Sequence, residues 1–325
     1  MNIYVTRRIP EVGLQMLEKA FGKIEVNPDD RVLTREELLE KVKGRDAVLC
    51  LLTDKIDDEV MAAAGPQCKV FSNYAVGFNN IDVPAASKRK IMITNTPGVL
   101  TDTTADMAIA LMFSVARRVA ESDVYMRSGQ FAGWAPMLLL GKEMTGKTLG
   151  IVGAGRIGEN VARKMAKGFG MKILYTDLAG NESLEKEVGA RKVDLETLCK
   201  ESDYISIHVT YSNATHHLID EKMLNCMSPS TILVNTSRGP VVDEAALVKV
   251  LQEGKIFGAG LDVFEDEPKM KPGLAECKNA IIVPHLGSAT IETRSKMAEI
   301  ASQNLINALQ GRTPEFLVNK EAIEV

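Results

Sequence analysis

Short apolar runs alternate with polar, helix-prone segments along almost the whole chain. The first part contains four such runs, NIYVT at 2–6, DAVLCLL at 46–52, KVFSNYAV at 69–76 and IMITNT at 91–96. Segments with a helical pattern lie between them, for example TREELLEKVKG at 34–44. Strands that alternate with helices are typical of parallel sheets covered by helices, so the pattern predicts an α/β fold.

A second series of strands begins at KTLGIVGAG, residues 147–155. Its expected strands are LGIVG at 149–153, KILYTD at 172–177, YISIHV at 204–209, TILVNTS at 231–237, FGAGLDV at 257–263 and AIIVPH at 280–285. Two series of this kind predict two Rossmann-like domains, each with a doubly wound parallel sheet, and an active-site cleft between them.

The boundary between the two series lies near residue 100. Pro97 and Gly98 interrupt the chain, and Thr101 can cap one long helix predicted over 102–129. That helix is apolar over much of its surface, so we expect cover from its own domain and from a second subunit of a homodimer. A last helix, expected over 289–309, would return to the first domain before a short strand-like piece, PEFLV. The expected domains are 1–100 with 288–325, and 101–287.

Composition narrows the class of protein. A chain of 325 residues is long enough for two domains. The net charge of −4 gives no reason to expect a nucleic-acid or membrane partner, and no apolar run has the length of a signal peptide or membrane span. The five cysteines are odd in number and never spaced as C-x-x-C. This pattern indicates free thiols in a reducing, cytoplasmic compartment, and no metal site is expected.

A glycine-rich turn stands between the first strand and the first helix of the second series. Gly153, Gly155 and Gly158 form G-x-G-x-x-G, and the next strand ends in Asp177. The glycines permit a tight turn, close approach to a pyrophosphate and close helix packing, and the acid can bind a ribose 2′-hydroxyl. Because LAGNES after Asp177 contains no Arg or Lys to hold a 2′-phosphate, we favour NAD over NADP. The alternative is a glycine turn that only packs a helix.

Three polar residues follow predicted strands, where ligands bind in open α/β sheets. They are Arg238 in ILVNTSRGPVVDE, Glu267 in GLDVFEDEP and His285 in IIVPH. Arginine can hold a carboxylate with two hydrogen bonds, histidine can transfer a proton near neutral pH, and a neighbouring carboxylate can orient its ring. Taken singly, each could be structural: a strand-end histidine, a turn-capping arginine and a solvated acid. Together, beside a dinucleotide motif, they predict an active site.

The sequence resembles the D-isomer-specific 2-hydroxyacid dehydrogenase family over essentially its full length, and within it most of all the glyoxylate and hydroxypyruvate reductases. The motifs that carry the resemblance are YAVGFNNIDV, TPGVLTDTTAD, GIVGAGRIG, HVTYSNATHHLI, LVNTSRGPVVDE, AGLDVFEDEP and VPHLGSAT. The resemblance implies that 101–287 binds NAD and that the other domain binds substrate. It also implies Arg238 as the clamp on the substrate carboxylate, His285 as the acid/base and Glu267 as its partner.

Further roles come from the resemblance alone. The backbone amides around Val76 and Gly77 would hold the same carboxylate, and the loop with Leu52 would border the substrate. Besides the glycine motif, the implied cofactor contacts are Thr104, Arg156, Ile157, Asp177, Thr210, Thr236 and Asp262. For Trp134, the only tryptophan, two alternatives are open: an aromatic packed in its own chain, or a residue that reaches into the partner subunit's active site.

The predicted activity is the NAD(H)-dependent reduction of a small 2-oxo acid, glyoxylate or hydroxypyruvate, to the D-2-hydroxy acid. His285 would give its proton to the ketone oxygen as hydride arrives from the nicotinamide. We expect His208, His216 and His217 to be structural or at the surface. The alternatives are a phosphoglycerate or phosphite dehydrogenase, or a regulatory protein that senses NAD(H) without turnover.

Overall fold

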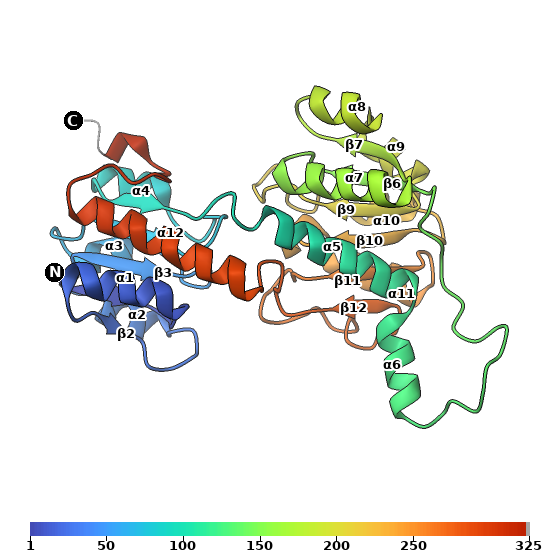
Figure 1. The fold of residues 1–325 in the computed structure, drawn as a ribbon, viewed down its shortest axis with the longest axis horizontal. Helices are drawn as coiled ribbons and strands as arrows, with labels where there is room; N and C mark the ends of the chain where they lie inside the picture. The colour runs from blue at the N-terminus through green and yellow to red at the C-terminus, as the bar shows by residue number, and fades with distance from the viewer. Residues whose placement is uncertain (323–325) are drawn as a thin grey trace. The chain divides into compact units, whose positions relative to one another are not determined.

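The computed structural model describes residues 1–322 and divides into two compact units. The first contains Met1–Leu100 and the segment from Ala289 onward, and the second contains Thr101–Ser288. Each unit is an α/β structure with a parallel sheet (Figure 1). The predicted α/β class with doubly wound parallel sheets is confirmed.

The described part of the first unit has a five-stranded sheet in the order β2-β1-β3-β4-β5, with every pair parallel. The strands are β1 (Ile3–Val5), β2 (Glu25–Val26), β3 (Ala47–Cys50), β4 (Val70–Asn73) and β5 (Met92–Thr94). The helices are α1 (Glu11–Phe21), α2 (Arg35–Lys41), α3 (Asp58–Ala64), α4 (Val83–Lys88), α12 (Ile291–Leu309) and the short 3₁₀ helix η2 (Lys320–Ala322).

Alternate residues of these strands face two different hydrophobic clusters. Leu49 packs with side chains of α1 and α12, whereas its neighbours Val48 and Cys50 pack with side chains of α2, α3 and α4. A strand buried on both faces needs apolar residues at successive positions, which explains the continuous run DAVLCLL. Helix α2 starts at a capping box, in which Thr34 and Glu37 each accept a backbone N–H of the other.

The described part of the second unit has a seven-stranded parallel sheet in the order β12-β11-β10-β9-β6-β7-β8. Its strands are β6 (Thr148–Val152), β7 (Lys172–Thr176), β8 (Arg191–Lys192), β9 (Tyr204–Ile207), β10 (Ile232–Asn235), β11 (Gly258–Leu261) and β12 (Ala280–Ile282). Its helices are α5 (Thr101–Ala116), α6 (Val119–Arg127), α7 (Arg156–Phe169), α8 (Glu182–Val188), α9 (Leu195–Glu201), α10 (Glu221–Cys226) and α11 (Glu244–Gln252), with the 3₁₀ turn η1 (Gly239–Val241).

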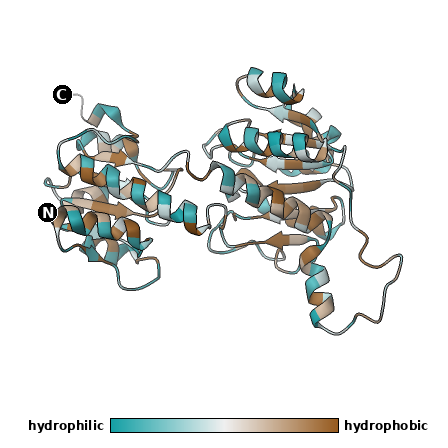
Figure 2. Cartoon of the chain, viewed as in Figure 1, coloured by the Kyte–Doolittle hydropathy of each residue, from teal (hydrophilic) through white to brown (hydrophobic). Residues whose placement is uncertain are grey.

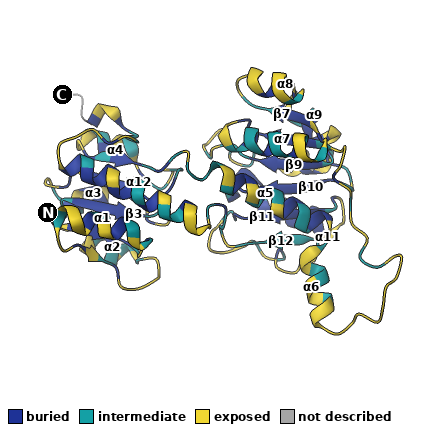
Figure 3. Cartoon of the chain, in the orientation of Figure 1, coloured by how far each residue is buried: buried dark blue, intermediate teal, exposed yellow. Residues whose placement is uncertain are grey.

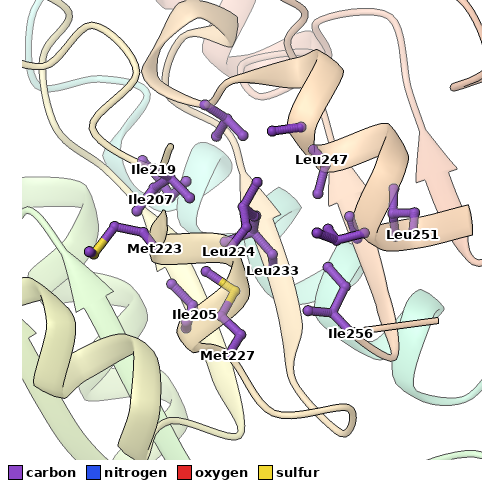
Figure 4. Close-up of a cluster of buried hydrophobic side chains, with 14 of the residues drawn as sticks. Ile205, Ile207, Ile219, Met223, Leu224, Met227, Leu233, Leu247, Leu251 and Ile256 are labelled. Atoms are coloured by element: carbon purple, nitrogen blue, oxygen red, sulfur yellow. The ribbon is translucent and has the colours of Figure 1, made fainter. Parts of the chain in front are cut away.

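Two hydrophobic clusters also cover this second sheet, one on each face. Side chains of β9 and β10 meet those of α10 and α11 in the first cluster (Figure 4). Side chains of α9 belong to the same cluster. Side chains of α5 and α7 pack on the opposite face in the second cluster. The central strands β9, β10 and β11 are accordingly fully buried (Figure 3) and mostly hydrophobic (Figure 2). This core fixes the carboxyl ends of β10, β11 and β12, from which the candidate site is built.

All ten of the listed apolar runs overlap a strand, although the strands are shorter than the runs, and two further details of the prediction are wrong. The helix expected over 102–129 is two helices, α5 and α6, because Arg118 adopts a left-handed conformation with φ of 52°. PEFLV at 314–318 is not a strand and makes one antiparallel bridge, between Leu317 and Thr94. The run AIIVPH is a strand only as far as Ile282.

No helix within residues 1–322 combines the length and the apolar character needed to cross a membrane.

Candidate active site

The polar residues predicted from the sequence lie at one edge of the second sheet. Strands β10, β11 and β12 are parallel neighbours, so their carboxyl ends lie side by side. Arg238 follows β10, Asp262 follows β11 directly, and His285 follows β12. Glu267 lies on the segment after β11, and residues 264–271 of that segment are called the Glu267 loop below.

His285 and Glu267 form a hydrogen-bonded pair. The His285 Nδ1 atom lies 3.1 Å from Glu267 Oε2, and both side chains keep part of their surface exposed, 28% and 33% respectively. Glu267 Oε1 accepts the backbone N–H of Phe264 at 3.0 Å. Both carboxylate oxygens are therefore engaged, and the bond at Nδ1 leaves Nε2 as the atom that can exchange a proton with a ligand.

The backbone holds His285 in an uncommon conformation. Its φ of 54° lies in the left-handed region, which a residue with a side chain rarely adopts. Its N–H donates to the carbonyl oxygens of Asp262 and Val283, at 3.0 and 3.1 Å. These bonds fix the histidine at the end of β12, next to β11. Positive φ at a non-glycine residue is typical of functional sites.

The pKa of Glu267 reflects both burial and its partner. Burial raises the pKa of this carboxyl, but the hydrogen bond and the charge of His285 outweigh it, so the pKa lies below the ordinary value of 4.5. The Phe264 N–H and the charge of Arg238 also lower the pKa of Glu267. Glu267 is therefore a carboxylate at neutral pH, able to orient an imidazolium.

Arg238 is a partly buried cation at the end of β10. Burial lowers its pKa from 12.5, and the charge of Glu267 opposes that shift. Asn235 holds the turn that presents the arginine, because its side-chain amide donates to the Arg238 carbonyl at 3.0 Å and its oxygen accepts the Ser237 N–H at 3.0 Å. A guanidinium cannot lose its proton in a protein, so Arg238 is a permanent positive charge in a half-buried position.

Asp262 joins the ends of β11 and β12. It is buried, and its two carboxylate oxygens accept the backbone N–H groups of Leu286 and Gly287. Burial raises the pKa of Asp262 above the ordinary value, although those two N–H groups and His285 oppose the shift. A β-carbon at Gly287 would lie 3.0 Å from the Asp262 carboxylate and 3.4 Å from Thr104 Cγ2, so this position requires a small residue.

The G-x-G-x-x-G segment forms the expected turn between β6 and α7. Gly153 has a φ of 94°, and a β-carbon there would lie 2.8 Å from the Val209 nitrogen. Gly155 is the N-cap of α7, and a β-carbon at this exposed position would meet nothing within 4 Å. At Gly158 a β-carbon would lie 2.1 Å from the Gly153 carbonyl oxygen. The turn thus offers backbone N–H groups at a helix start, the arrangement that binds a pyrophosphate.

Two side chains around this turn also suit a dinucleotide. Asp177, after β7, accepts the Ala154 N–H at 2.8 Å, which places the acid beside the glycine turn. Thr236, after β10, has a buried hydroxyl without a hydrogen-bond partner among residues 1–322. An unpartnered buried hydroxyl costs free energy unless a ligand completes it. The glycine cradle, the acid and the hydroxyl therefore fit NAD(H).

Comparison with known proteins agrees with this geometry. Residues 109–287 match the family model described as the NAD binding domain of D-isomer specific 2-hydroxyacid dehydrogenases. The chain is 51% identical over 326 residues to the glyoxylate reductase of Thermococcus litoralis, in an alignment that covers 99% of this chain and 98% of that protein. The chain belongs to the D-isomer specific 2-hydroxyacid dehydrogenases. The predictions of this family and of an NAD(H) cofactor are confirmed.

Two solved structures illustrate the range of this family. The TT0316 protein of Thermus thermophilus is 41% identical, with a TM-score of 0.91 over 98% of this chain and 100% of that chain. The NADPH-dependent glyoxylate/hydroxypyruvate reductase of Sinorhizobium meliloti is 30% identical, with a TM-score of 0.84 over 99% of this chain and 98% of that chain. Structures this similar to the present dehydrogenase therefore include an enzyme that depends on NADPH.

The remaining predicted cofactor contacts of the dehydrogenase occupy different environments. Thr104 is buried on α5, close to Gly287. Arg156 and Ile157 begin α7 directly after the glycine turn, and Arg156 is exposed there. Thr210 is exposed beyond β9, and its carbonyl accepts the Thr215 hydroxyl. All four lie in the second unit, and their contacts with a cofactor remain predictions.

The predicted substrate-binding residues of the first unit lie after β3 and β4. The Val76 and Gly77 carbonyls accept side-chain amides of Asn95 and Asn73, at 2.8 and 2.9 Å. Within residues 1–322, neither Val76 nor Gly77 donates its own backbone N–H to another residue. The arrangement leaves two amide groups for an anion, and their role for the substrate remains a prediction.

Leu52 lies on a loop that is tied to the same segment. The Asn80 side chain donates to the Leu51 and Asp54 carbonyls at 3.1 and 3.0 Å, so it joins the loops after β3 and β4. Asp54 is buried and accepts the Leu51 N–H at 2.8 Å. The loop is therefore well fixed, with Leu52 36% exposed.

Trp134 does not pack in its own chain. Its side chain is 84% exposed, so the alternative of a packed aromatic is wrong. It lies in an extended segment after α6, a helix without buried residues (Figure 3).

The other histidines of the dehydrogenase have different polar partners. His208 follows β9, contacts the Ser206 hydroxyl at 2.8 Å, and has a pKa lowered to about 3 by burial. His216 is exposed and its ring stacks on that of His217 at 4.0 Å. His217 is partly buried, 3.4 Å from the Glu265 carboxylate. The polar contacts of these three rings are thus with residues other than His285 and Glu267.

Sequence reasoning missed the residues that hold the site together. Asn235 fixes the turn before Arg238, and Glu244, at the start of α11, accepts two backbone N–H groups of the Glu267 loop. Both belong to the motif LVNTSRGPVVDE, in which only Thr236 and Arg238 were predicted as site residues. A polar residue as the last position of a buried apolar strand was the available sign for Asn235.

Proposed function

We propose that this dehydrogenase reduces glyoxylate, and the related acid hydroxypyruvate, with NADH. The observation that carries the proposal is the pair of His285 and Glu267, 3.1 Å apart, on the sheet edge that also bears the cation Arg238. A 2-oxo acid presents a carboxylate and an adjacent ketone. A fixed cation and a proton donor are the groups such a molecule needs.

Each residue has a distinct part in the proposed reaction. The guanidinium of Arg238 binds the substrate carboxylate with two hydrogen bonds and so sets the orientation of the ketone. NADH, when bound, supplies the hydride that adds to the ketone carbon. Protonated His285 donates its Nε2 proton to the ketone oxygen, so the product hydroxyl carries one new proton. Glu267 holds the imidazole by Nδ1 and stabilises its charge.

Several observations support the choice of cofactor and substrate. Asp177 lies at the glycine turn, where a carboxylate accepts a ribose hydroxyl and repels a 2′-phosphate. The relative from Thermococcus litoralis and that from Korarchaeum cryptofilum, each 51% identical, are both named glyoxylate reductases. Small acids of this size also suit the loop after β3, where the apolar residues Leu51 and Leu52 lie.

We also propose that the enzyme is a homodimer. The arm, defined as residues 119–140, is exposed and carries a set of large apolar side chains: Val119, Val124, Met126, Phe131, Trp134, Met137 and Leu140. Apolar groups gathered on one exposed segment favour burial against a partner. A partner subunit would cover the arm and bring Trp134 toward its active site. Sedimentation analysis that gives a monomer at micromolar concentration would contradict this.

A cytoplasmic location is part of the proposal. All five cysteines are free thiols, and four of them are buried, at positions 50, 68, 199 and 277. Buried, unpaired thiols are typical of proteins from reducing compartments.

The experiment that tests the proposed chemistry is turnover by His285→Asn. The variant removes the proton donor and keeps a similar volume, so kcat for glyoxylate is expected to fall by about 10²-fold or more. NADH binding, followed by fluorescence, should stay near that of the wild type. The matched control is His216→Asn, an exposed histidine that contacts no predicted site residue. Equal turnover in both variants would reject the role of His285. Tight NADH binding by a wild type that turns over no 2-oxo acid would favour an NAD(H) sensor.

A further inference from the structure

The Glu267 loop has a second anchor that no predicted role explains. Glu244 is the first residue of α11 and is only 3% exposed. Its Oε2 accepts the Glu265 N–H at 2.6 Å, and its Oε1 accepts the Lys271 N–H at 2.7 Å. One buried carboxylate therefore holds the loop at two points, one before Glu267 and one after it.

Glu265 also accepts a hydrogen bond from the backbone of Glu244. Its Oε2 accepts the Glu244 N–H at 3.2 Å, so α11 and the loop are joined in both directions. Two carboxylates this close repel each other unless cations lie nearby. Lys271 Nζ lies 3.1 Å from Glu265 Oε1, and His217 Nε2 lies 3.4 Å from Glu265 Oε2. Lys271 therefore places a positive charge beside Glu265.

The backbone of the Glu267 loop also packs closely against the turn that carries Arg238. A β-carbon built at Gly239 would lie 1.8 Å from the Phe264 carbonyl carbon and 2.4 Å from the Glu265 nitrogen. Backbone packs on backbone there, so a movement of Phe264 or Glu265 would disturb the residue directly after Arg238. Phe264 is also the residue whose N–H binds Glu267 Oε1.

These contacts form a short path from α11 to the proton donor. Glu244 fixes the backbone at Glu265 and Lys271, the Phe264 N–H fixes one oxygen of Glu267, and the other oxygen contacts His285 Nδ1. We propose that Glu244 is a positioning residue that sets the geometry of the Glu267–His285 pair. This inference rests on the proposed function for its kinetic test, but its structural test does not require activity.

The kinetic test uses Glu244→Gln, with Asp266→Asn as the matched control. Glutamine keeps the size of the side chain but places an NH₂ group against one of the two N–H donors, so one anchor is lost. Asp266 lies on the same loop, is 57% exposed and binds the Lys271 side chain, so the control removes one negative charge without touching the anchor.

We expect Glu244→Gln to lower kcat for 2-oxo acid reduction by about tenfold or more, since small misplacements of catalytic groups reduce rates strongly. The KM for NADH should stay within about twofold of the wild-type value. The effect should not add to that of Glu267→Gln, because the anchor acts through that residue. A kcat equal to that of Asp266→Asn, or full additivity with Glu267→Gln, would overturn the proposal.

The structural test compares crystal structures of the wild type and Glu244→Gln. We expect a longer distance between Glu267 Oε2 and His285 Nδ1 in the variant. An unchanged distance would overturn the proposal, and this result does not depend on whether the protein reduces a 2-oxo acid. If Glu244→Gln fails to fold, Glu244→Asp replaces it in both tests. Aspartate keeps the charge but is one methylene shorter, so the same lengthening and the same loss of kcat are expected.

Discussion

Glu267→Gln tests how much the Glu267–His285 contact contributes to the reaction. Glutamine has nearly the same volume, and its oxygen can still accept the Phe264 N–H, but the negative charge beside the imidazole is lost. A hydrogen bond to a charged group contributes about 1.5–3 kcal/mol. Both side chains remain partly exposed, at 28% and 33%, so solvent screening places the effect near the lower end of that range.

A loss of about 1.5–2 kcal/mol corresponds to about a 13- to 30-fold reduction in kcat/KM for glyoxylate. The assay is NADH oxidation at saturating cofactor, repeated between pH 5 and pH 9. The imidazolium loses its counter-charge in the variant, so the decline of the reduction rate with rising pH should begin at a lower pH than in the wild type.

The control for this experiment is Asp266→Asn, which removes a neighbouring exposed charge. Its kcat/KM should stay within about twofold of the wild type, the effect expected for an exposed ion pair. If Glu267→Gln lowers kcat/KM less than threefold, or if its pH profile matches that of the control, the carboxylate does not stabilise the proton donor and the reasoning from the 3.1 Å contact is wrong.

Three further predictions concern other residues. Arg238→Lys keeps the charge but loses the two-pronged fork, so the KM for glyoxylate should rise by about tenfold or more while the KM for NADH stays the same; an unchanged glyoxylate KM would refute the clamp. Asp177→Ala should lower kcat/KM with NADH by about tenfold and so reduce the ratio of kcat/KM with NADH to kcat/KM with NADPH. An unchanged ratio would show that Asp177 does not bind the ribose. Burial lowers the pKa of His208 from 6.5 to about 3, so the unfolded chain binds more protons between these values and stability should be lost as pH falls below about 6.5. The free energy of unfolding should fall by at most about 1.4 kcal/mol per pH unit. Denaturant titrations at several pH values should show a smaller fall for His208→Gln than for the wild type. The same dependence of unfolding free energy on pH in both proteins would show that His208 is not the group responsible.

The sequence was sufficient for features that depend on local pattern. Apolar runs on strands buried on both faces, such as the one that contains Leu49, are visible without any tertiary information. The glycine turn is largely local, since the positive φ of Gly153 and the close approach of Gly158 to the Gly153 carbonyl arise within a few residues of the chain. The convergence of Arg238 and His285 was predictable because parallel strands end at one edge of a sheet.

Other features could not be predicted because they depend on distant parts of the chain or on single backbone angles. Strands β2 and β8 are two-residue edge strands without an apolar run. The break between α5 and α6 depends on the left-handed angle of Arg118, which nothing in the helical pattern indicates. Glu244 binds the backbone of Glu265 and Lys271, which lie 21 and 27 residues later in the chain. A buried acid at a helix start looks like an ordinary first-turn acid until the loop that contacts it is known.

The central claim is that this dehydrogenase reduces glyoxylate with NADH. The most direct measurement is oxidation of NADH and of NADPH by the wild-type enzyme with glyoxylate, hydroxypyruvate, pyruvate and phenylpyruvate in turn. We expect rapid turnover of glyoxylate or hydroxypyruvate, a higher kcat/KM with NADH than with NADPH, and slower turnover of the bulkier phenylpyruvate. NADH binding without turnover of any of the four acids would contradict the central claim and would direct the next assay to phosphite oxidation.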